Sequence, residues 1–488
     1  MKSRALLLAV LVLAGCSVGP DYKRPELSIP NEFRGRTPDA PARAESLGDL
    51  GWWQIFQDEI LQSLMRTALA ENYDLRIATS RILDARARVT FNRSFQAPDL
   101  SASASAPYTY IPGERVPNQF RETFAPLGTF DMFWEIDFWG RFRRATEAAR
   151  ADLLASESAQ RFVMTTLVSD VATAYFQLRE LDLELEISRR TLASRENSLR
   201  LVKLRQEGAV ASMMDVRQAE VLLYTAAETI PDIERRIEQT ENQISILLGR
   251  NPNAVPRGRP LLQQLALPAI PAGLPSSLLE RRPDIQDAEG QLAAATARIG
   301  VAKSDYFPRV ILTGAAGAGG IKIDGSWFGP QGLLAIAPQL TLPIFNWGRV
   351  GAGVDSASAQ AQQALFHYQQ TVQQAFRDVA DALVEHRKRG ESRVQQEGLV
   401  VSLRDAARLA DVRYRGGVTS YLEVLDTERQ LFDAELNLAR TQRDELLAVV
   451  LLYRALGGGW MVEQSPAAAS HEPGGGTVVV NDRKGGSK

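Results

Sequence analysis

Two short stretches of this sequence repeat each other 208 residues apart, at Gly208 and Gly416. In both, an arginine is followed by a glycine, a valine and a serine at the same spacing, and a long helical pattern flanks each side. Glycine permits the left-handed conformation that ends a helix, and serine caps the helix that follows. We therefore expect tight bends at 208–212 and 416–420, built by Gly208, Ser212, Gly416, Gly417 and Ser420.

Further landmarks recur at nearly the same spacing, which makes a chance match of helix-end residues the weaker interpretation. Pro98 matches Pro308, Gly140 matches Gly348, and the Leu-Gly pair ending at Gly249 recurs at 457. Repetition at a fixed period predicts copies of one structural unit. We expect these segments: an N-terminal extended segment at 16–57, a first repeat at 58–250, a linker at 251–275, a second repeat at 276–460 and a disordered tail at 461–488.

Each repeat has the pattern of a helix, a hairpin and two long helices. The stretch Arg141–Glu207 holds neither Gly nor Pro, and as one helix it would reach about 100 Å, against typical helices of about 11–12 residues. Ser212–Leu248 is its expected antiparallel partner, where Pro231 is predicted to kink or split the helix. The first helix of the chain is expected from Glu59 to about Gln96.

Between these helices the apolar period changes from helical spacing to two. In the first repeat the bulky residues Phe130, Met132 and Trp134 alternate with polar neighbours. This predicts hairpins at about 99–140 and 309–346, with loops at 112–119 and 324–332. Bulky apolar residues on one face are typical of lipid-facing barrel strands, although a soluble sandwich is the alternative. The acidic residues expected on the opposite, lumen-facing side are Asp131, Glu135 and Asp137.

Two such hairpins cannot form a complete membrane structure. Unpaired backbone groups at an open sheet edge cost several kcal/mol each in lipid, and closing a barrel takes about 8 strands. We therefore expect an oligomer of at least two copies, with the long helices leaving the barrel at one end.

The N-terminus has the pattern of an export signal at 1–15. Lys2 and Arg4 precede an apolar stretch, 5–13, that is too short to span a bilayer. The sequence Leu-Ala-Gly-Cys ending at Cys16 resembles a bacterial lipoprotein box. That resemblance implies a lipid on Cys16, and Ser17 after it implies sorting to the outer membrane. The alternative is a buried cysteine in a cytoplasmic helix.

Composition argues against several classes of protein. The 56 basic and 58 acidic residues nearly balance, so no nucleic-acid partner is expected. Three histidines and one cysteine exclude a disulfide framework and leave little for a Cys/His metal site. The sequence shows no catalytic constellation, so we expect no enzyme, no metal and no cofactor beyond the covalent lipid.

Taken together, these motifs resemble the outer-membrane factor family, the TolC-like efflux ducts, in the lipid-anchored NodT-type branch. The residues that carry the resemblance are the segments 134–141 and 342–348 and the second bend, 413–422. The resemblance implies an α+β membrane protein, a homotrimer whose twelve-stranded transmembrane β-barrel continues into a periplasmic α-helical coiled-coil tunnel. It also implies two protein partners, a periplasmic adaptor and an inner-membrane pump of the resistance-nodulation-division type.

The resemblance further places a gate at the second bend. It implies that Leu422 and Asp426 form stacked rings that narrow the tip, and that Tyr414, Arg415 and Arg429 latch it shut. Asp215 is a weaker candidate partner for an arginine latch. The alternative is structural: Leu422 would be a coiled-coil core residue and Asp426 with Arg429 an i,i+3 surface pair.

The function expected from these features is a passive exit duct for small molecules in a tripartite efflux system. Two alternatives stay open at this point. One is a TolC-like duct for type I protein secretion, and the other is a lipid-anchored trimeric coiled-coil protein without a pore. The two lipid-facing hairpins argue against the coiled-coil alternative.

Overall fold

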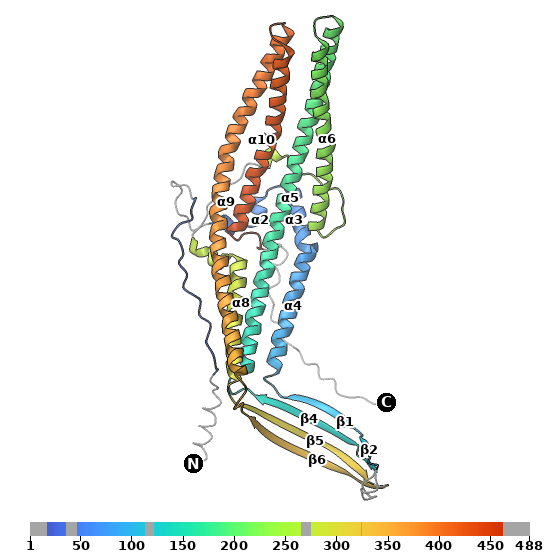
Figure 1. The fold of residues 1–488 in the computed structure, drawn as a ribbon, viewed down its shortest axis with the longest axis vertical. Helices are drawn as coiled ribbons and strands as arrows, with labels where there is room; N and C mark the ends of the chain where they lie inside the picture. Colours follow the sequence, from blue (N-terminus) through green and yellow to red (C-terminus); the bar gives the residue numbers. More distant parts are fainter. Residues whose placement is uncertain (1–16, 36–45, 113–121, 265–274, 324, 462–488) are drawn as a thin grey trace, which may run out of the picture.

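A computed structural model describes residues 17–35, 46–112, 122–264, 275–323 and 325–461. The described chain is a long rod with a twisted sheet at one end and two helical hairpins at the other (Figure 1). The predicted signal peptide, Cys16 and the tail from 462 lie outside the described residues. So do most of the first predicted hairpin loop and part of the predicted linker.

The helices and strands follow in the order that the repeats predict. The helical elements are η1 (Leu47–Asp49), α2 (Trp52–Ile55), α3 (Glu59–Glu71), α4 (Tyr73–Ser94), α5 (Arg141–Glu207), α6 (Met213–Leu247), η3 (Leu261–Gln264), η4 (Pro275–Ser277), α7 (Leu278–Arg281), α8 (Pro283–Ser304), α9 (Arg349–Arg415) and α10 (Tyr421–Ala455). The strands are β1 (Asp99–Ser105), β2 (Tyr108–Tyr110), β3 (Glu122–Phe124), β4 (Leu127–Ile136), β5 (Arg309–Ile323) and β6 (Ser326–Thr341).

The two repeats match element by element. Helices α4 and α8 each have 22 residues, α5 and α9 each have 67, and α6 and α10 each have 35. Gly140 and Gly348 precede the two long helices with φ of 78° and 76°, a conformation that disfavours any side chain. Helix α5 spans the whole Gly- and Pro-free stretch, so its predicted bounds are confirmed.

Two helix predictions are wrong in detail. The single helix expected from Glu59 is broken at Asn72, whose extended backbone separates α3 from α4. The Asn72 side chain caps α4 by accepting from the Leu75 N–H at 3.1 Å, and it donates to the Leu247 carbonyl at 2.9 Å. Helix α6 runs unbroken past Pro231, so Pro231 does not split the helix, and a kink at Pro231 stays a prediction.

The strands form one sheet in the order β1-β4-β5-β6, and β3 and β2 extend it beside β5. The first hairpin is interrupted at Pro107 and Pro126, which divide its arms into β1 with β2 and β3 with β4. In the second hairpin the predicted loop is too long. Strand β6 already begins at Ser326, and Trp327 and Phe328 pair with β5.

Strand register places most of the bulky residues of both hairpins on one face. Leu100 pairs with Met132, which pairs with Gly314, which pairs with Ile336. Phe130 and Leu334, on the same face, are 74% and 78% exposed. The other face carries mostly small and polar side chains, among them Ser101, Ser103, Thr129, Asp131, Thr313 and Gln339, together with the larger Phe133, Ile311 and Leu333. The predicted alternation is confirmed. Among the described residues, no helix has the length and apolar character needed to span a membrane.

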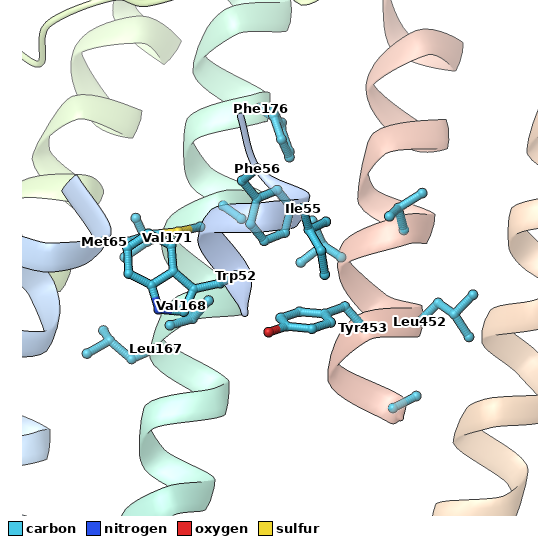
Figure 2. Packing of buried hydrophobic residues seen from close by; sticks show 14 of the residues in the cluster. Trp52, Ile55, Phe56, Met65, Leu167, Val168, Val171, Phe176, Leu452 and Tyr453 are labelled. Atoms are coloured by element: carbon cyan, nitrogen blue, oxygen red, sulfur yellow. The ribbon is translucent and has the colours of Figure 1, made fainter. Parts of the chain in front are cut away.

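A dense apolar core at the waist joins the helices, as Figure 2 shows. Trp52, Tyr175 and Tyr453 are almost fully buried there. The rings of Phe56 and Tyr453 meet edge to face, with centroids 6.1 Å apart. The Tyr175 hydroxyl donates to the buried Asp58 carboxylate at 2.9 Å. Because this core clamps α3, α5 and α10 together, the sheet and the helical tips are the two ends of one body.

The helical tip as candidate functional site

Both predicted bends lie at the far end of the rod (Figure 1). In the second, Gly417 is the left-handed residue with φ of 73°, and the Val418 N–H donates to the Arg413 carbonyl at 3.0 Å. In the first, the left-handed residue is Ala209, with φ of 57°, whereas Gly208 has φ of −77°. The expectation that Gly208 supplies the left-handed turn is therefore wrong. The turn falls one residue later, as it does in the second bend.

The two serines both occupy the N-cap position but differ in their bonds. Ser212 forms a full capping box with Asp215, in which the Asp215 N–H donates to the Ser212 hydroxyl and the carboxylate accepts from the Ser212 N–H at 2.8 Å. Ser420 makes no side-chain cap bond. The Asp215 carboxylate thus serves the cap of α6, and within the described chain its hydrogen-bond partner is Ser212 rather than an arginine.

Tyr414 lies in a small core that joins the two helical hairpins at the tip. Its ring packs on Tyr421, with centroids 5.1 Å apart, and the Arg205 guanidinium sits 4.6 Å over it. Both tyrosines are buried, among residues of α5, α6, α9 and α10. The Tyr414 hydroxyl has no hydrogen-bond partner among the described residues. Tyr414 therefore holds the tip by packing within this chain.

Burial also keeps the two tyrosine hydroxyls of this core protonated. It raises the pKa of Tyr414 and of Tyr421, and the nearby Asp215 carboxylate adds to both shifts. Arg205 opposes the shift at Tyr414. Both hydroxyls are therefore neutral at physiological pH. The contact of Arg205 with Tyr414 was not predicted from the sequence, although Arg205 and Arg413 occupy equivalent positions in the two bends.

The predicted constriction residues share one exposed face of α10. Leu422 is 61% exposed, so within this chain it is no core residue. The Asp426 carboxylate accepts from Arg429 at 2.9 Å and from the Gln430 amide at 2.6 Å. The i,i+3 pair that formed part of the structural alternative is therefore present. An exposed pair of this kind contributes about 0–1 kcal/mol to stability.

The remaining charges at the second bend pair locally. Arg415 binds Asp411 one turn earlier on α9 at 2.9 Å, and Arg413 reaches Glu423 of α10 at 3.6 Å. The Glu423 carboxylate also accepts from the Thr419 hydroxyl. The Arg413–Glu423 contact joins the two arms of the bend, and the side chains of Arg413 and Arg415 are more than half exposed.

A buried arginine, which no sequence pattern singles out, lies further from the tip. Arg195 of α5 is 3% exposed, donates to the Leu222 carbonyl at 2.5 Å and stacks on Phe432 at 4.9 Å. Burial lowers the pKa of Arg195, and burial raises the pKa of Glu428 opposite it. Arg195 thus links the helical hairpin of α5 and α6 to α10, at a level between the tip and the waist.

At the sheet end, the three predicted acidic residues differ in their surroundings. Asp131 accepts from Ser103 and Thr129 across the polar face of the sheet. Glu135 pairs with Arg141 at 3.2 Å. Asp137 lies just past the end of β4, and its carboxylate accepts from the backbone N–H of Arg143 at 2.9 Å, which caps the start of α5. No group of three or more His, Cys, Asp or Glu side chains in the described residues could hold a metal ion.

Comparison with known proteins identifies the architecture. The family model for outer membrane efflux proteins matches residues 64–250 and 274–458, the two repeats. This chain belongs to the outer membrane efflux protein family. The family supplies the outer-membrane exit ducts of efflux pumps, and like its relatives the protein resides in the outer membrane of Gram-negative bacteria.

Two curated relatives show what members of the family do. The solvent efflux pump outer membrane protein SrpC of Pseudomonas putida is 36% identical over 479 residues, covering 95% of this chain and 100% of SrpC. The cation efflux system protein CusC of Escherichia coli is 33% identical over 454 residues, covering 92% of this chain and 97% of CusC.

A solved relative has the same fold. The open state of the Neisseria gonorrhoeae MtrE outer membrane channel is 32% identical to this efflux protein. It superimposes with a TM-score of 0.82, covering 91% of this chain and 99% of MtrE. The fold class is therefore that of the TolC-like channels.

Proposed function

We propose that three copies of this chain form a lipid-anchored duct that conducts small molecules passively from an inner-membrane pump, through a gated periplasmic tip, to the exterior. The observation that carries the proposal is the one-sided apolar sheet at the end of a long helical rod. Its bulky face suits lipid, its other face is mostly small and polar, and the outer edges of strands β1 and β6 have no partner strand in the described chain.

Assembly follows from those free edges. Four hairpin arms per chain cannot close a barrel, and unpaired backbone is costly in lipid. Three copies supply twelve arms, more than the roughly 8 that closure requires. The helices α5, α6, α9 and α10 of three copies then make a twelve-helix tunnel. In this arrangement Asp131 and Glu135 face the lumen of the barrel. Asp137 lies at the rim of the barrel where the sheet meets the helices.

The N-terminal segment supports a lipid anchor of the NodT type. Ser17 packs against Gly140, and the Val18 N–H donates to the Trp139 carbonyl at 3.1 Å. These contacts fix the residue after Cys16 at the junction between the sheet and α5. A lipid on Cys16 would enter the membrane beside the barrel, with its acyl chains in the leaflet that faces the periplasm.

The gate is proposed at the second bend. Leu422 and Asp426 of three copies form the constriction, and Tyr414, Arg415, Arg429 and Asp215 hold the tip closed. Exposed ion pairs are weak enough to be exchanged when partners dock. The partners are a periplasmic adaptor and an inner-membrane pump of the resistance-nodulation-division type. The pump selects the cargo, and solvents, antibiotics and cations are the classes that the names of relatives suggest.

Single-channel conductance in a planar bilayer tests the proposal. Wild type should show a small conductance that is mostly closed, and the double variant Asp426→Ala/Arg429→Ala should raise it. The matched control is Asp232→Ala/Arg235→Ala, which removes an exposed i,i+3 pair of α6 with a separation of 2.5 Å. Equal conductance in all three proteins would be consistent with a duct but would refute a gate at Asp426 and Arg429. Absence of any pore would refute the duct and favour the lipid-anchored coiled coil.

A further inference from the structure

A cavity of about 650 Å³ lies between the tip and the waist, where three helices meet. It is lined by α5, α9 and α10, and α10 packs on both of the others. In Figure 1, α10 lies between α9 and α5 in this upper part of the rod. The volume is within the range of about 300–1,000 Å³ that is typical of small-molecule sites. A molecule bound here would contact both helical hairpins of the chain, α5 with α6 and α9 with α10.

One carboxylate of the protein already joins two walls of this cavity. Glu435 of α10 accepts a hydrogen bond from Arg190 of α5 at 2.7 Å and another from Arg404 of α9 at 2.7 Å. Both arginine side chains are more than half exposed, whereas that of Glu435 is largely buried. Hydrogen bonds between a guanidinium and a carboxylate are about twice as strong as those between neutral groups. A carboxylate between two arginines is therefore the bond that links α5 to α9 at this level.

The next helical turn towards the tip repeats the two arginines without the carboxylate. Helices α5 and α9 run towards the tip, and α10 runs away from it. Five residues further along α5 comes Arg195, and four residues further along α9 comes Arg408; both line the cavity. Four residues before Glu435, α10 contributes Leu431 to the same lining. At about 1.5 Å per residue, all three positions lie roughly one turn closer to the tip. At this turn α10 thus presents an apolar side chain in place of an acid.

Arg195 has unused hydrogen-bond donors in this cavity. A guanidinium carries five N–H donors. Within the described chain, that of Arg195 donates one hydrogen bond, to the Leu222 carbonyl, and its Nε has no acceptor. Glu428 and Asp433 of α10 act on Arg195 through charge, without a hydrogen bond. Because a buried donor without an acceptor is costly, the site favours a ligand that brings an acceptor to Arg195.

Arg408 is the accessible cation at the same turn. Its side chain is more than half exposed and pairs with Asp405 of its own helix at 2.7 Å. An exposed pair of this kind is weak, so the Arg408 guanidinium can exchange it for a ligand. Leu431 and Ala407 supply apolar surface beside the two arginines, and Ser194 takes up little space. Two cations next to apolar surface suit a molecule that carries both a carboxylate and an apolar body.

We propose that this cavity binds a small organic carboxylate, whose carboxylate group lies between Arg195 and Arg408 and whose apolar body lies on Leu431. The bound molecule repeats, one turn closer to the tip, the bridge that Glu435 makes. It ties α5 to α9 and so holds the first helical hairpin against the second. The site is built within one chain, and its existence therefore does not depend on the proposed trimer or gate.

Glu428 is the acidic group that a carboxylate ligand meets in this cavity. It lines the cavity, whereas the other two acids of the lining, Asp411 and Glu435, are paired with arginines. Burial raises the pKa of Glu428, so its charge is held less firmly than in water. Removing that charge removes a repulsion, and Glu428→Gln should therefore bind the ligand more tightly than wild type.

Isothermal titration calorimetry of the full-length protein in detergent, at constant ionic strength, tests the site with benzoate as the probe. Benzoate should bind once per chain, and its neutral analogue benzamide should not bind, because it brings no charge to the arginines. Sulfate should bind about tenfold more weakly than benzoate, because it gains nothing from Leu431. Absence of benzoate binding, or benzamide binding of equal strength, would overturn the site. Sulfate binding as tight as that of benzoate would overturn the assignment to an organic carboxylate.

Two matched pairs of variants locate the site. Leu431→Glu supplies the missing carboxylate from α10 and should abolish benzoate binding, whereas the neutral Leu431→Gln, of the same size, should still bind. Arg408→Gln should weaken binding about tenfold, because one charge-assisted bond is lost. Arg235→Gln is its control, since Arg235 is an exposed arginine of an i,i+3 pair on α6 and should leave the affinity unchanged. Equal affinities within either pair would refute this location.

Hydrogen exchange of the wild-type protein gives a second measurement that needs no variant. Benzoate should slow amide exchange in residues 190–200 of α5 and 403–412 of α9, and leave residues 232–245 of α6 unchanged. Protection confined to other segments would overturn the site. Protection in α5 without protection in α9 would refute the bridge between the two hairpins.

Discussion

Arg440 of α10 donates to the buried carboxylate of Glu184 on α5 at 2.7 Å and so links the two helical hairpins of the chain. Glu184 is 1% exposed and accepts a second bond from Arg236 of α6 at 3.2 Å. One carboxylate therefore holds three helices together between the waist and the tip. Any movement of the second hairpin against the first must break or stretch these bonds.

Glu184→Gln should destabilise the protein at neutral pH, because it leaves two arginines facing a neutral amide. Breaking a buried ion pair by removing one charge costs about 3 kcal/mol. We expect a lower melting temperature by circular dichroism at 222 nm. Glu186→Gln, an exposed position two residues on, is the control and should match wild type. Equal melting temperatures for the two variants would show that the linkage carries no stability.

Glu180, one turn before Glu184, should make stability depend on pH. Burial first, and then the charge on Glu184, raise the pKa of Glu180 to about 7, although Arg443 opposes the shift. In the unfolded chain the Glu180 carboxyl has its ordinary pKa of about 4.5. Glu180 therefore contributes its full stabilisation of the folded state below that pH. Its contribution is lost as pH rises towards 7. Between pH 5 and 8, Glu180→Gln should gain up to about 3 kcal/mol over wild type.

The check is the melting temperature of both proteins across that pH range. The difference between them should widen as pH rises and then level off above about 7. A constant difference would mean that Glu180 carries its charge throughout, held by Arg443. Glu186→Gln again serves as the control, because its exposed carboxyl should give no widening.

Two substitutions of Tyr414 distinguish a packing role from a hydrogen-bonding role within one copy. Because its buried hydroxyl has no partner among the described residues, Tyr414→Phe should keep or slightly raise stability. Tyr414→Ala empties the space between Tyr421 and Arg205 and should cost about 3–5 kcal/mol locally. Hydrogen exchange of amides at both bends reports the difference. Fast exchange in Tyr414→Phe would instead reveal a bond that the hydroxyl makes in the assembled trimer.

The two bends should respond oppositely to exchange of glycine and alanine. Ala209 holds φ of 57°, which is costly for any side chain, so Ala209→Gly should stabilise the first bend by up to about 1 kcal/mol. Gly417 holds φ of 73° and has open space around it, so Gly417→Ala should destabilise the second bend by about 1 kcal/mol through the backbone alone. Hydrogen exchange at each tip measures both. Shifts of the same sign would contradict this account.

The sequence determined the parts of this protein that local chemistry controls. Gly140 and the glycine at 208 bound a stretch that only a helix suits, so α5 could be assigned to the residue. Alternation in β4 gave the two faces of the sheet, and the recurrence of Pro98, Gly140 and Gly249 gave the duplication. These features depend on residues close together in the chain.

Other features depended on partners that the chain brings from far away. Asn72 breaks a helix because the end of α6 lies beside it, and β6 starts early because β5 is long enough to pair with Trp327. The environments of Glu184 and Tyr414 come from helices that the sequence pattern does not align. Tertiary packing decided these points, because burial and ion pairing depend on distance in space and not on distance along the chain.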